Sequence, residues 1–283
     1  MGGRFEVDMK KTILFLGFAL LLNLNGQAFL NNIAFANTNC FLAVENDRVI
    51  KREGSYEQGH SPCSTFKIAI SLMGYNEDIL IDETHPELPF QDGYVDWLEI
   101  WKQPHNPTTW MKDSCVWYSQ VITQKLGMQK FKKYITKFDY GNHDVSGDKG
   151  KNDGLTHSWL SSSLQVSPAE QVKFLQKLLN NKLPVSLKSH EMTKKILFVG
   201  DLISGWKLYG KTGTGYFLNH DGSIDRERQI GWFVGWVENS DRAIIFASYI
   251  EDEYKAEFSA GKRAKEEARE KLVQLIKIGY ILE

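Results

Sequence analysis

The sequence predicts an α+β fold in which an antiparallel sheet is flanked by helices and a helical subdomain is inserted into the sheet domain. Two β-type runs near the start surround polar turn residues, and further strand-like runs separated by Gly, Asn and Asp follow near the end. Helix-type patterns fill the stretch between them. Because strands occur on both sides of the helical stretch, we expect them to share one sheet, with the helical subdomain at about 76–205.

The first elements follow from turn signals and apolar runs. Cys40–Val44 and Val49–Ile50 flank four polar residues, which predicts a hairpin. Phe66–Tyr75 is apolar and free of proline, so we expect a buried helix that opens at Ser64. The stretch 76–109 contains four of the chain's seven prolines and is predicted to be mostly loop.

The later elements follow from helix caps and periodicity. Gly127 suits the end of one helix, and Ser167 with Glu170 forms a capping box for another that has Pro168 in its first turn. The remaining predicted elements are helices over Asp113–Leu126, Met128–Phe138 and Pro168–Asn180, a loop over Asp139–Thr156, strands over Trp206–Thr212, Gln229–Val237 and Arg242–Ile250, and a closing helix over Ala260–Ile276.

Residues 1–36 have the pattern of a cleavable secretory signal peptide. Lys10 and Lys11 precede an apolar run over Ile13–Leu22, and Ala34-Phe35-Ala36 offers a small-residue cleavage site. A run of about ten apolar residues is short for a bilayer span, and an N-terminal membrane anchor is the alternative. We therefore expect export to the periplasm, no stable membrane anchor, and a single mature domain over 37–283.

The charge and the histidines argue against some classes of function. The formal net charge is −1 at pH 7, which gives no reason to expect nucleic acid or an anionic membrane as a partner. The seven histidines form no i,i+4 or H-x-H pair, so we expect no metal site. The sequence leaves the oligomeric state open.

The tetrapeptide Ser64-Thr65-Phe66-Lys67 carries the first chemical signal. In a helix that begins at Ser64, the Lys67 amine lies beside the Ser64 hydroxyl because residues three apart share a face. The free N–H groups and the dipole at a helix N-terminus also favour a developing oxyanion. The alternative is a helix-capping serine followed by a solvated lysine.

Two further short motifs gain meaning beside the first. Lys211-Thr212-Gly213 ends a strand-like run, where Lys211 and Thr212 suit an anionic group and Gly213 leaves room for a ligand close to the backbone. Ser114-Cys115-Val116 stands near the start of a predicted helix, where Ser114 suits proton transfer to a leaving nitrogen. Alone, these motifs also fit an edge lysine beside a turn and a capping serine.

Together the three motifs resemble those of penicillin-recognising serine enzymes, which combine Ser-x-x-Lys, a middle serine motif and Lys-Thr-Gly. Their order and spacing agree, and the middle motif, Ser-x-Val, is similar to that of the class D, or oxacillinase, β-lactamases. The resemblance covers the chain from about Phe41 to its end. Further segments that resemble this family are Tyr140-Gly141-Asn142, Trp159-Leu160 and the flanks of Ser64 and Lys211.

The resemblance implies a serine β-lactamase or penicillin-binding transpeptidase-like fold. It also implies hydrolysis of β-lactam antibiotics, which are small-molecule substrates, through an acyl-enzyme on Ser64. A free lysine is a poor base at neutral pH, and the apolar neighbours of Lys67 favour its neutral form. In the family this lysine is N-carboxylated by carbon dioxide or bicarbonate and serves as general base. The same is implied for Lys67, with Val116 keeping the site apolar and the Trp159 indole holding the carbamate.

The other implied roles concern the substrate. Ser114 passes a proton to the leaving nitrogen, and the backbone N–H groups of Ser64 and Thr214 form the oxyanion hole. The substrate carboxylate is expected at Lys211, Thr212, Gly213 and Thr214, with Arg263 as a candidate further ligand. Tyr140 is expected to be structural.

Several alternatives remain at this point. Cys63 and Cys115 flank two of the motif serines, and a disulfide between them is a hypothesis because an exported protein meets an oxidising compartment. A β-lactam sensor domain that is acylated without turnover is one rival function. A cell-wall peptidase and a non-catalytic exported protein that keeps the motifs are two others.

Overall fold

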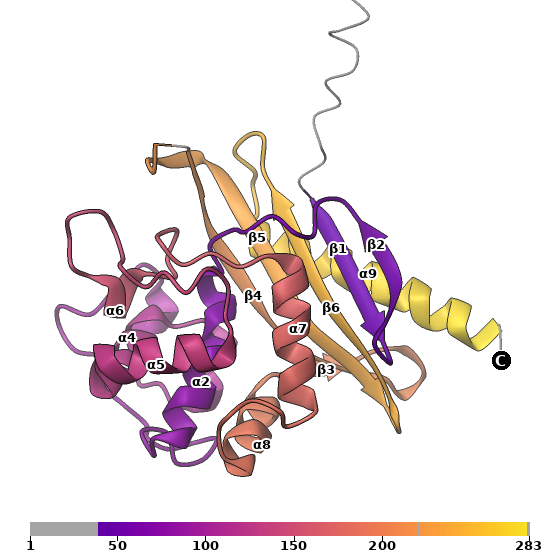
Figure 1. Ribbon diagram of the computed structural model, residues 1–283, viewed down its shortest axis with the longest axis horizontal. Helices are drawn as coiled ribbons and strands as arrows, with labels where there is room; N and C mark the ends of the chain where they lie inside the picture. The colour runs from indigo at the N-terminus through magenta and orange to yellow at the C-terminus, as the bar shows by residue number, and fades with distance from the viewer. Residues whose placement is uncertain (1–38, 220, 282–283) are drawn as a thin grey trace, which may run out of the picture. The chain divides into compact units, whose positions relative to one another are not determined.

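A six-stranded antiparallel sheet forms the frame of the molecule (Figure 1). The computed structural model describes residues 39–219 and 221–281, so the predicted signal segment 1–36 lies outside it. The strand order is β2-β1-β6-β5-β4-β3. The strands are β1 Cys40–Glu45, β2 Arg48–Glu53, β3 Phe198–Asp201, β4 Lys207–Leu218, β5 Ile224–Asn239 and β6 Arg242–Glu251.

The first and last parts of the chain meet in this sheet. β1 pairs with β2 on one side and with β6 on the other, and Phe41 lies opposite Ser248. The helical stretch therefore interrupts the sheet in sequence but not in space. The predicted α+β class, with one shared sheet, is confirmed.

Helices cover both faces of the sheet. α9 lies along one face, and the helices of the middle region lie on the other (Figure 1). No helix within the described ranges combines the length and apolar character needed to cross a bilayer. The helical elements are η1 Cys63–Phe66, α2 Lys67–Asn76, η2 Glu99–Trp101, α3 Pro107–Asp113, α4 Val116–Leu126, α5 Met128–Phe138, α6 Gly154–His157, α7 Pro168–Leu179, α8 Leu187–Ile196, η3 Ile203–Gly205 and α9 Ala260–Ile281.

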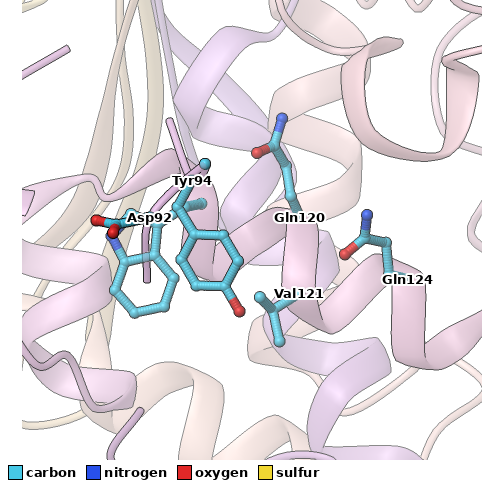
Figure 2. Close-up of a pocket in the computed structure, with 7 residues that line it drawn as sticks. Asp92, Tyr94, Gln120, Val121 and Gln124 are labelled. Atoms are coloured by element: carbon cyan, nitrogen blue, oxygen red, sulfur yellow. The ribbon is translucent and has the colours of Figure 1, made fainter. Parts of the chain in front are cut away.

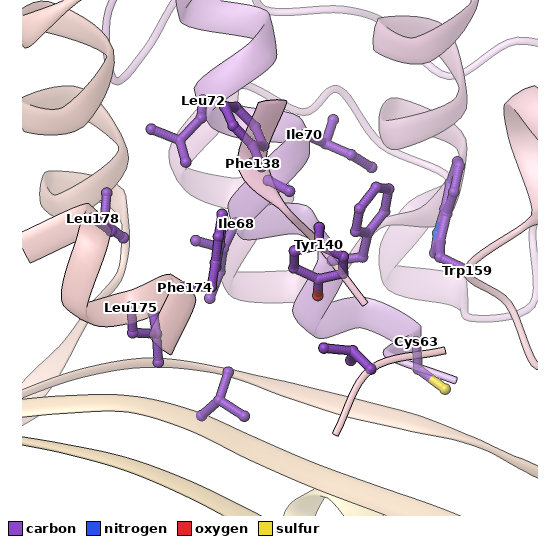
Figure 3. Packing of buried hydrophobic residues seen from close by; sticks show 14 of the residues in the cluster. Cys63, Ile68, Ile70, Leu72, Phe138, Tyr140, Trp159, Phe174, Leu175 and Leu178 are labelled. Atoms are coloured by element: carbon purple, nitrogen blue, oxygen red, sulfur yellow. The ribbon is translucent and has the colours of Figure 1, made fainter. Parts of the chain in front are cut away.

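Strand alternation divides the core into two layers. Phe233 and Phe246 pack with α9, whereas Trp232 and Val234 pack with the middle helices, because successive strand side chains point to opposite faces. α2 is the centre of the larger layer, where every residue from Lys67 to Tyr75 is buried (Figure 3). A helix that is apolar all round belongs inside a core.

Helical elements run from η1 at Cys63 to α8 at Ile196, and η3 follows at Ile203–Gly205, so the predicted start of the helical subdomain at about 76 leaves out α2. α2 belongs with it because this helix packs on α4 and α8. Strand β3 and helix α8 were not predicted. β4 continues to Leu218, beyond the predicted end at Thr212, because Gly213 and Gly215 remain paired with β5.

The helix predicted over Asp113–Leu126 is wrong at its start. Two helices occupy this part of the chain, α3 and α4, and Ser114 separates them in a left-handed conformation. Asn106 and Thr109 form a capping box at the start of α3, with Pro107 in its first turn. This signal is present in the sequence inside the stretch predicted as loop.

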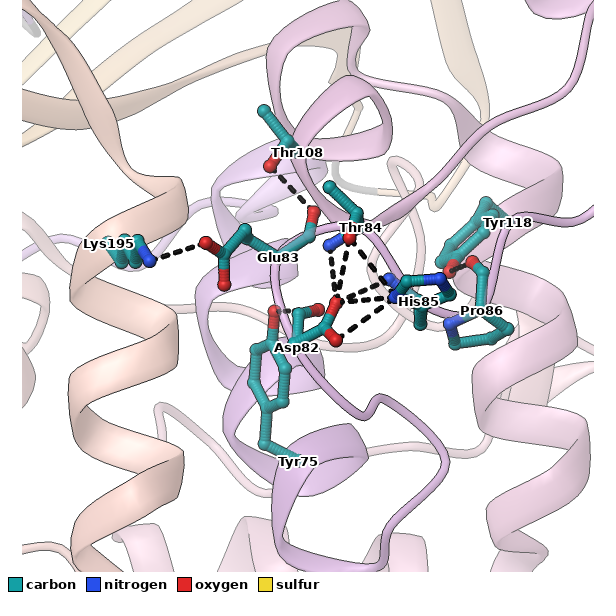
Figure 4. A network of polar contacts seen from close by, with 9 residues as sticks. All are labelled: Tyr75, Asp82, Glu83, Thr84, His85, Pro86, Thr108, Tyr118 and Lys195. Atoms are coloured by element: carbon teal, nitrogen blue, oxygen red, sulfur yellow. Dashed lines mark hydrogen bonds and ion pairs between the residues drawn. The ribbon is translucent and has the colours of Figure 1, made fainter.

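The long loop between α2 and α3 is held by polar contacts rather than by regular structure (Figure 4). Asp82 accepts hydrogen bonds from the backbone N–H groups of Thr84 and His85, both at 2.8 Å. The Thr108 hydroxyl donates to the Glu83 carbonyl at 2.7 Å, and Tyr118 donates to that of Pro86 at 2.7 Å. These contacts fix the loop to α3 and α4.

Candidate active site

Ser64 and Lys67 lie one turn apart in a continuous helical segment. The 3₁₀ turn η1 runs directly into α2, and Lys67 Nζ donates to Ser64 Oγ at 3.1 Å. Ser64 is half-buried and Lys67 is fully buried. The two side chains therefore meet as their three-residue spacing predicts.

The surroundings of Lys67 favour its neutral form. Burial lowers the pKa of the Lys67 amine from 10.5 to about 7, and the nearby thiols of Cys115 and Cys63 oppose this shift only in part. Burial also raises the pKa of Cys63 to about 11 and that of Cys115 to about 12, so both thiols are protonated at neutral pH. A large fraction of the Lys67 amine is therefore unprotonated near pH 7.

Strand β4 closes on the helical segment at two glycines. A Cβ at Gly213 would lie 2.9 Å from the Pro62 carbonyl oxygen, and one at Gly215 would lie 2.4 Å from Cys63 Sγ. Gly213 thus permits contact between β4 and η1, whereas the sequence suggested that it leaves room for a ligand. Lys211 points to this same face because side chains two apart share a face of the strand.

Lys211 is the second buried amine of the site. Its Nζ donates to the Thr212 carbonyl at 3.0 Å and to Thr212 Oγ1 at 3.2 Å. Burial lowers the pKa of Lys211 well below 10.5, and the positive charges of Lys67 and Lys265 lower it further. Lys67 and Lys211 are therefore close enough to repel each other across the site.

Alternate backbone N–H groups of β4 point to the edge that faces away from β5. Gly210 N–H donates to the Leu197 carbonyl at 2.9 Å and Tyr216 N–H donates to Ser161 Oγ at 2.9 Å, both on this edge. The backbone alternates between edges, so the N–H of Thr214 also points to it. The Thr214 side chain accepts from Gly261 N–H of α9 at 3.1 Å.

Ser114 approaches the site from a turn. It stands between α3 and α4 with φ 59° and ψ 31°, and its neighbour Cys115 is within electrostatic reach of Lys67. Val116 is buried at the first position of α4. The three motifs of the sequence are therefore brought around the same amine.

Trp159 and Tyr140 lie beside the helical segment that carries the serine and pack against Phe66 (Figure 3). Trp159 is fully buried, its ring centroid is 5.5 Å from that of Phe66, and its indole N–H has no acceptor among the described residues. Burial raises the pKa of Tyr140 well above 10, which makes it unsuited to act as a base. This agrees with the structural role expected for Tyr140.

Arg263 does not offer a free guanidinium. Its Nη2 forms an ion pair with the buried carboxylate of Asp252, and its Nε donates to the Phe258 carbonyl at 3.1 Å. The helix instead directs Lys265 toward Lys211, because Lys265 follows Gly261 by one turn and Gly261 packs against β4. Sequence reasoning missed Lys265, since nothing in the order of residues shows which turn of α9 faces β4.

The proposed Cys63–Cys115 disulfide is not formed. Both cysteines, together with Cys40, are free and buried. Cys63 Sγ instead donates to the Ser61 carbonyl at 3.5 Å and packs where a Cβ at Gly215 would lie. This packing directs the Cys63 thiol toward β4.

Two other features lie apart from the motif residues. Ligand atoms of Asp148, Asp153 and His157 fall within 4.8 Å of one another, but Lys151 and Ser162 already donate to Asp148 at 2.8 Å each. A pocket of about 300 Å³ lies between α4 and the preceding loop (Figure 2) and is lined by Asp92, Gly93, Tyr94, Trp117, Gln120, Val121 and Gln124. It contains none of the motif residues.

The chain is similar to known proteins over most of its length. Residues 33–273 match the family model described as the penicillin binding protein transpeptidase domain. Beta-lactamase OXA-9 of Klebsiella pneumoniae is 39% identical over 75% of this chain and 80% of its own length. Beta-lactamase OXA-1 of Escherichia coli is 43% identical over 74% and 72%. The crystal structure of the OXA-427 class D β-lactamase is 45% identical, covers 85% of this chain and 99% of its own, and superposes with a TM-score of 0.81. The chain therefore belongs to the class D β-lactamases.

Proposed function

We propose that the mature protein opens β-lactam antibiotics through an acyl-enzyme on Ser64, hydrolyses that ester and so confers resistance. One observation carries the proposal: a buried Lys67 amine with a pKa near 7 lies 3.1 Å from the Ser64 hydroxyl. A half-buried serine beside a neutral amine is an activated nucleophile. We place this activity in the periplasm, on the basis of the signal pattern in residues 1–36.

The residues around Lys67 fit an N-carboxylated lysine. The amine is neutral enough to react with carbon dioxide, and the orphaned indole N–H of Trp159 supplies a donor that a carbamate oxygen would satisfy. The carboxyl group would supply a base for acylation and for deacylation. Val116 and the two protonated thiols keep the surroundings free of competing charge.

The other residues act on the substrate. Ser64 attacks the lactam carbonyl, and the N–H groups of Ser64 and Thr214 stabilise the oxyanion. Ser114 passes a proton to the leaving nitrogen. Lys211 and Thr212 hold the substrate carboxylate, and Lys265 adds positive charge behind them. We assign no carboxylate contact to Arg263, because Asp252 holds it.

Nitrocefin hydrolysis by the purified mature protein tests the proposal, with Ser64→Ala as the inactive control. We expect turnover that falls when bicarbonate is depleted and recovers when it is added. Turnover indifferent to bicarbonate would exclude the carbamate but keep the acyl-enzyme. A single stoichiometric burst that stops at any bicarbonate concentration would instead identify a sensor that is acylated without turnover.

A further inference from the structure

Ser114 depends on neighbours for its position. A non-glycine residue in the left-handed region is disfavoured and persists where the surroundings impose it. Ser114 is the C-cap residue of α3, and its backbone N–H donates to the Trp110 carbonyl, but the Asp113 carbonyl of the same peptide bond lies at the helix end, where the helix supplies no donor.

Two buried indole groups donate consecutive hydrogen bonds that lead to the turn at Ser114. Trp101 Nε1–H donates to the Asp113 carbonyl at 2.9 Å, which belongs to the peptide bond that leads into Ser114. Trp117 Nε1–H donates to the Trp101 carbonyl at 2.8 Å. Both rings are buried, so neither bond competes with bulk water.

The loop that carries Trp101 is itself held in place. His105 exchanges backbone hydrogen bonds with Leu88, and its ring Nε2 donates to the Ile100 carbonyl at 3.2 Å. The Tyr94 ring stacks on Trp117 with centroids 5.0 Å apart, at the wall of the pocket in Figure 2. Trp101 is therefore anchored at its backbone and can fix the carbonyl to which it donates.

We propose that Trp101 is a positioning residue for Ser114: its indole N–H sets the orientation of the 113–114 peptide and thereby aims the Ser114 hydroxyl at the leaving nitrogen. The inference rests on the proposed role of Ser114 in proton transfer. Trp101 touches neither substrate nor Ser64 in this scheme and acts through the turn alone.

The test compares Trp101→Phe with Trp236→Phe. Each replaces a buried indole by a smaller ring and deletes one hydrogen bond, but the Trp236 bond goes to Glu238 Oε2 at 2.9 Å, on strand β5 away from the turn. Stopped-flow measurement with nitrocefin gives the acylation rate constant, and thermal unfolding gives the stability of each variant. We expect Trp101→Phe to slow acylation about tenfold, the scale of one hydrogen bond, and Trp236→Phe to stay within about twofold of the parent at a similar loss of Tm.

A double-mutant cycle separates positioning from general damage. Trp101→Phe added to Ser114→Ala is expected to cause no further loss, because both changes act on one interaction. Equal slowing by Trp101→Phe in both backgrounds, or equal effects of the two tryptophan variants, overturns the inference. A Ser114→Ala variant with parental acylation overturns the role of Ser114 itself. If Trp101→Phe does not fold, Trp117→Phe takes its place in the test. Trp117→Phe deletes the hydrogen bond from Trp117 to the Trp101 carbonyl, and we expect it to slow acylation less than Trp101→Phe would.

Discussion

The two buried lysines of this protein lie on opposite sides of one site and differ in their hydrogen-bonding partners. Lys67, on α2, has Ser64 Oγ at 3.1 Å and two protonated thiols close by. Lys211, on β4, has two acceptors from Thr212. Burial lowers the pKa of both amines, but the thiols near Lys67 oppose this shift in part, whereas the positive charges of Lys67 and Lys265 lower the pKa of Lys211 further.

This difference separates two chemical tasks. An amine that loses its proton near neutral pH is suited to become, or to carry, a base. An amine held by a carbonyl and a hydroxyl at the edge of a strand is placed to donate to an anion, whose negative charge would raise the pKa of the amine. Removing each lysine in turn, and then residues around it, tests this contrast.

We expect the largest effect from removing the Lys67 amine on α2. Lys67→Met preserves side-chain volume and deletes the base, so kcat should fall on the order of 10³-fold and the acyl-enzyme should accumulate. Intact-protein mass spectrometry after mixing with a penicillin detects the adduct. The exposed Lys188 serves as a control as Lys188→Met. Near-parental turnover by Lys67→Met would end the assignment of Lys67.

Removal of the Lys211 amine on β4 should weaken the binding of the substrate. Lys211→Met deletes a hydrogen-bond donor that the substrate carboxylate would keep charged, so kcat/KM should fall roughly 10- to 100-fold, with most of the loss in KM. Steady-state kinetics on one penicillin and on an analogue without the carboxylate provides the check. If the two substrates suffer equally, Lys211 does not hold the carboxylate.

Trp159→Phe should affect the carboxylation of Lys67 on α2 and leave Lys211 on β4 unaffected. The change removes the orphaned indole N–H while keeping an aromatic ring against Phe66. We expect the bicarbonate concentration for half-maximal activity to rise about tenfold, the scale of one hydrogen bond to a charged group. Titration of activity against bicarbonate measures this, and an unchanged midpoint would show that Trp159 does not hold a carbamate.

The pH dependence should follow Lys67. Its pKa is lowered to about 7, so the amine gains a proton below that pH and loses its ability to react with carbon dioxide. Activity at fixed bicarbonate should therefore be level above pH 8 and fall roughly tenfold per unit below pH 6. A profile with its midpoint near pH 4 would point to a carboxylate side chain instead.

The smallest effect distinguishes Lys265 from Arg263. Lys265→Ala should raise KM by no more than about fivefold, because a half-exposed charge contributes little. Arg263→Ala should leave KM unchanged and lower Tm, because it strands the buried Asp252 carboxylate. The reverse pattern would restore Arg263 as the carboxylate ligand.

Local patterns predicted the elements whose signals are contiguous in the chain. The capping box at Ser167 and the Ser64–Lys67 contact follow from residues near one another in sequence, and the shared sheet follows from strand-like runs on both sides of the helical stretch. The break at Ser114 was missed, because its left-handed backbone is imposed by the packing of α3 and α4. The identity of the lysine facing Lys211 was missed for a similar reason: it depends on the rotation of α9 against β4.

The pairing of β1 with β6 has a consequence for the synthesis of the chain. Phe41 emerges early from the ribosome and its partner Ser248 emerges near the end, so β1 stays unpaired on one side while every helix between them is made. Such long-range pairing slows folding and leaves a strand edge exposed meanwhile. Chains that stop before β6 should therefore be substrates for chaperones or proteases, even though they already contain Ser64, Lys67, Ser114 and Lys211.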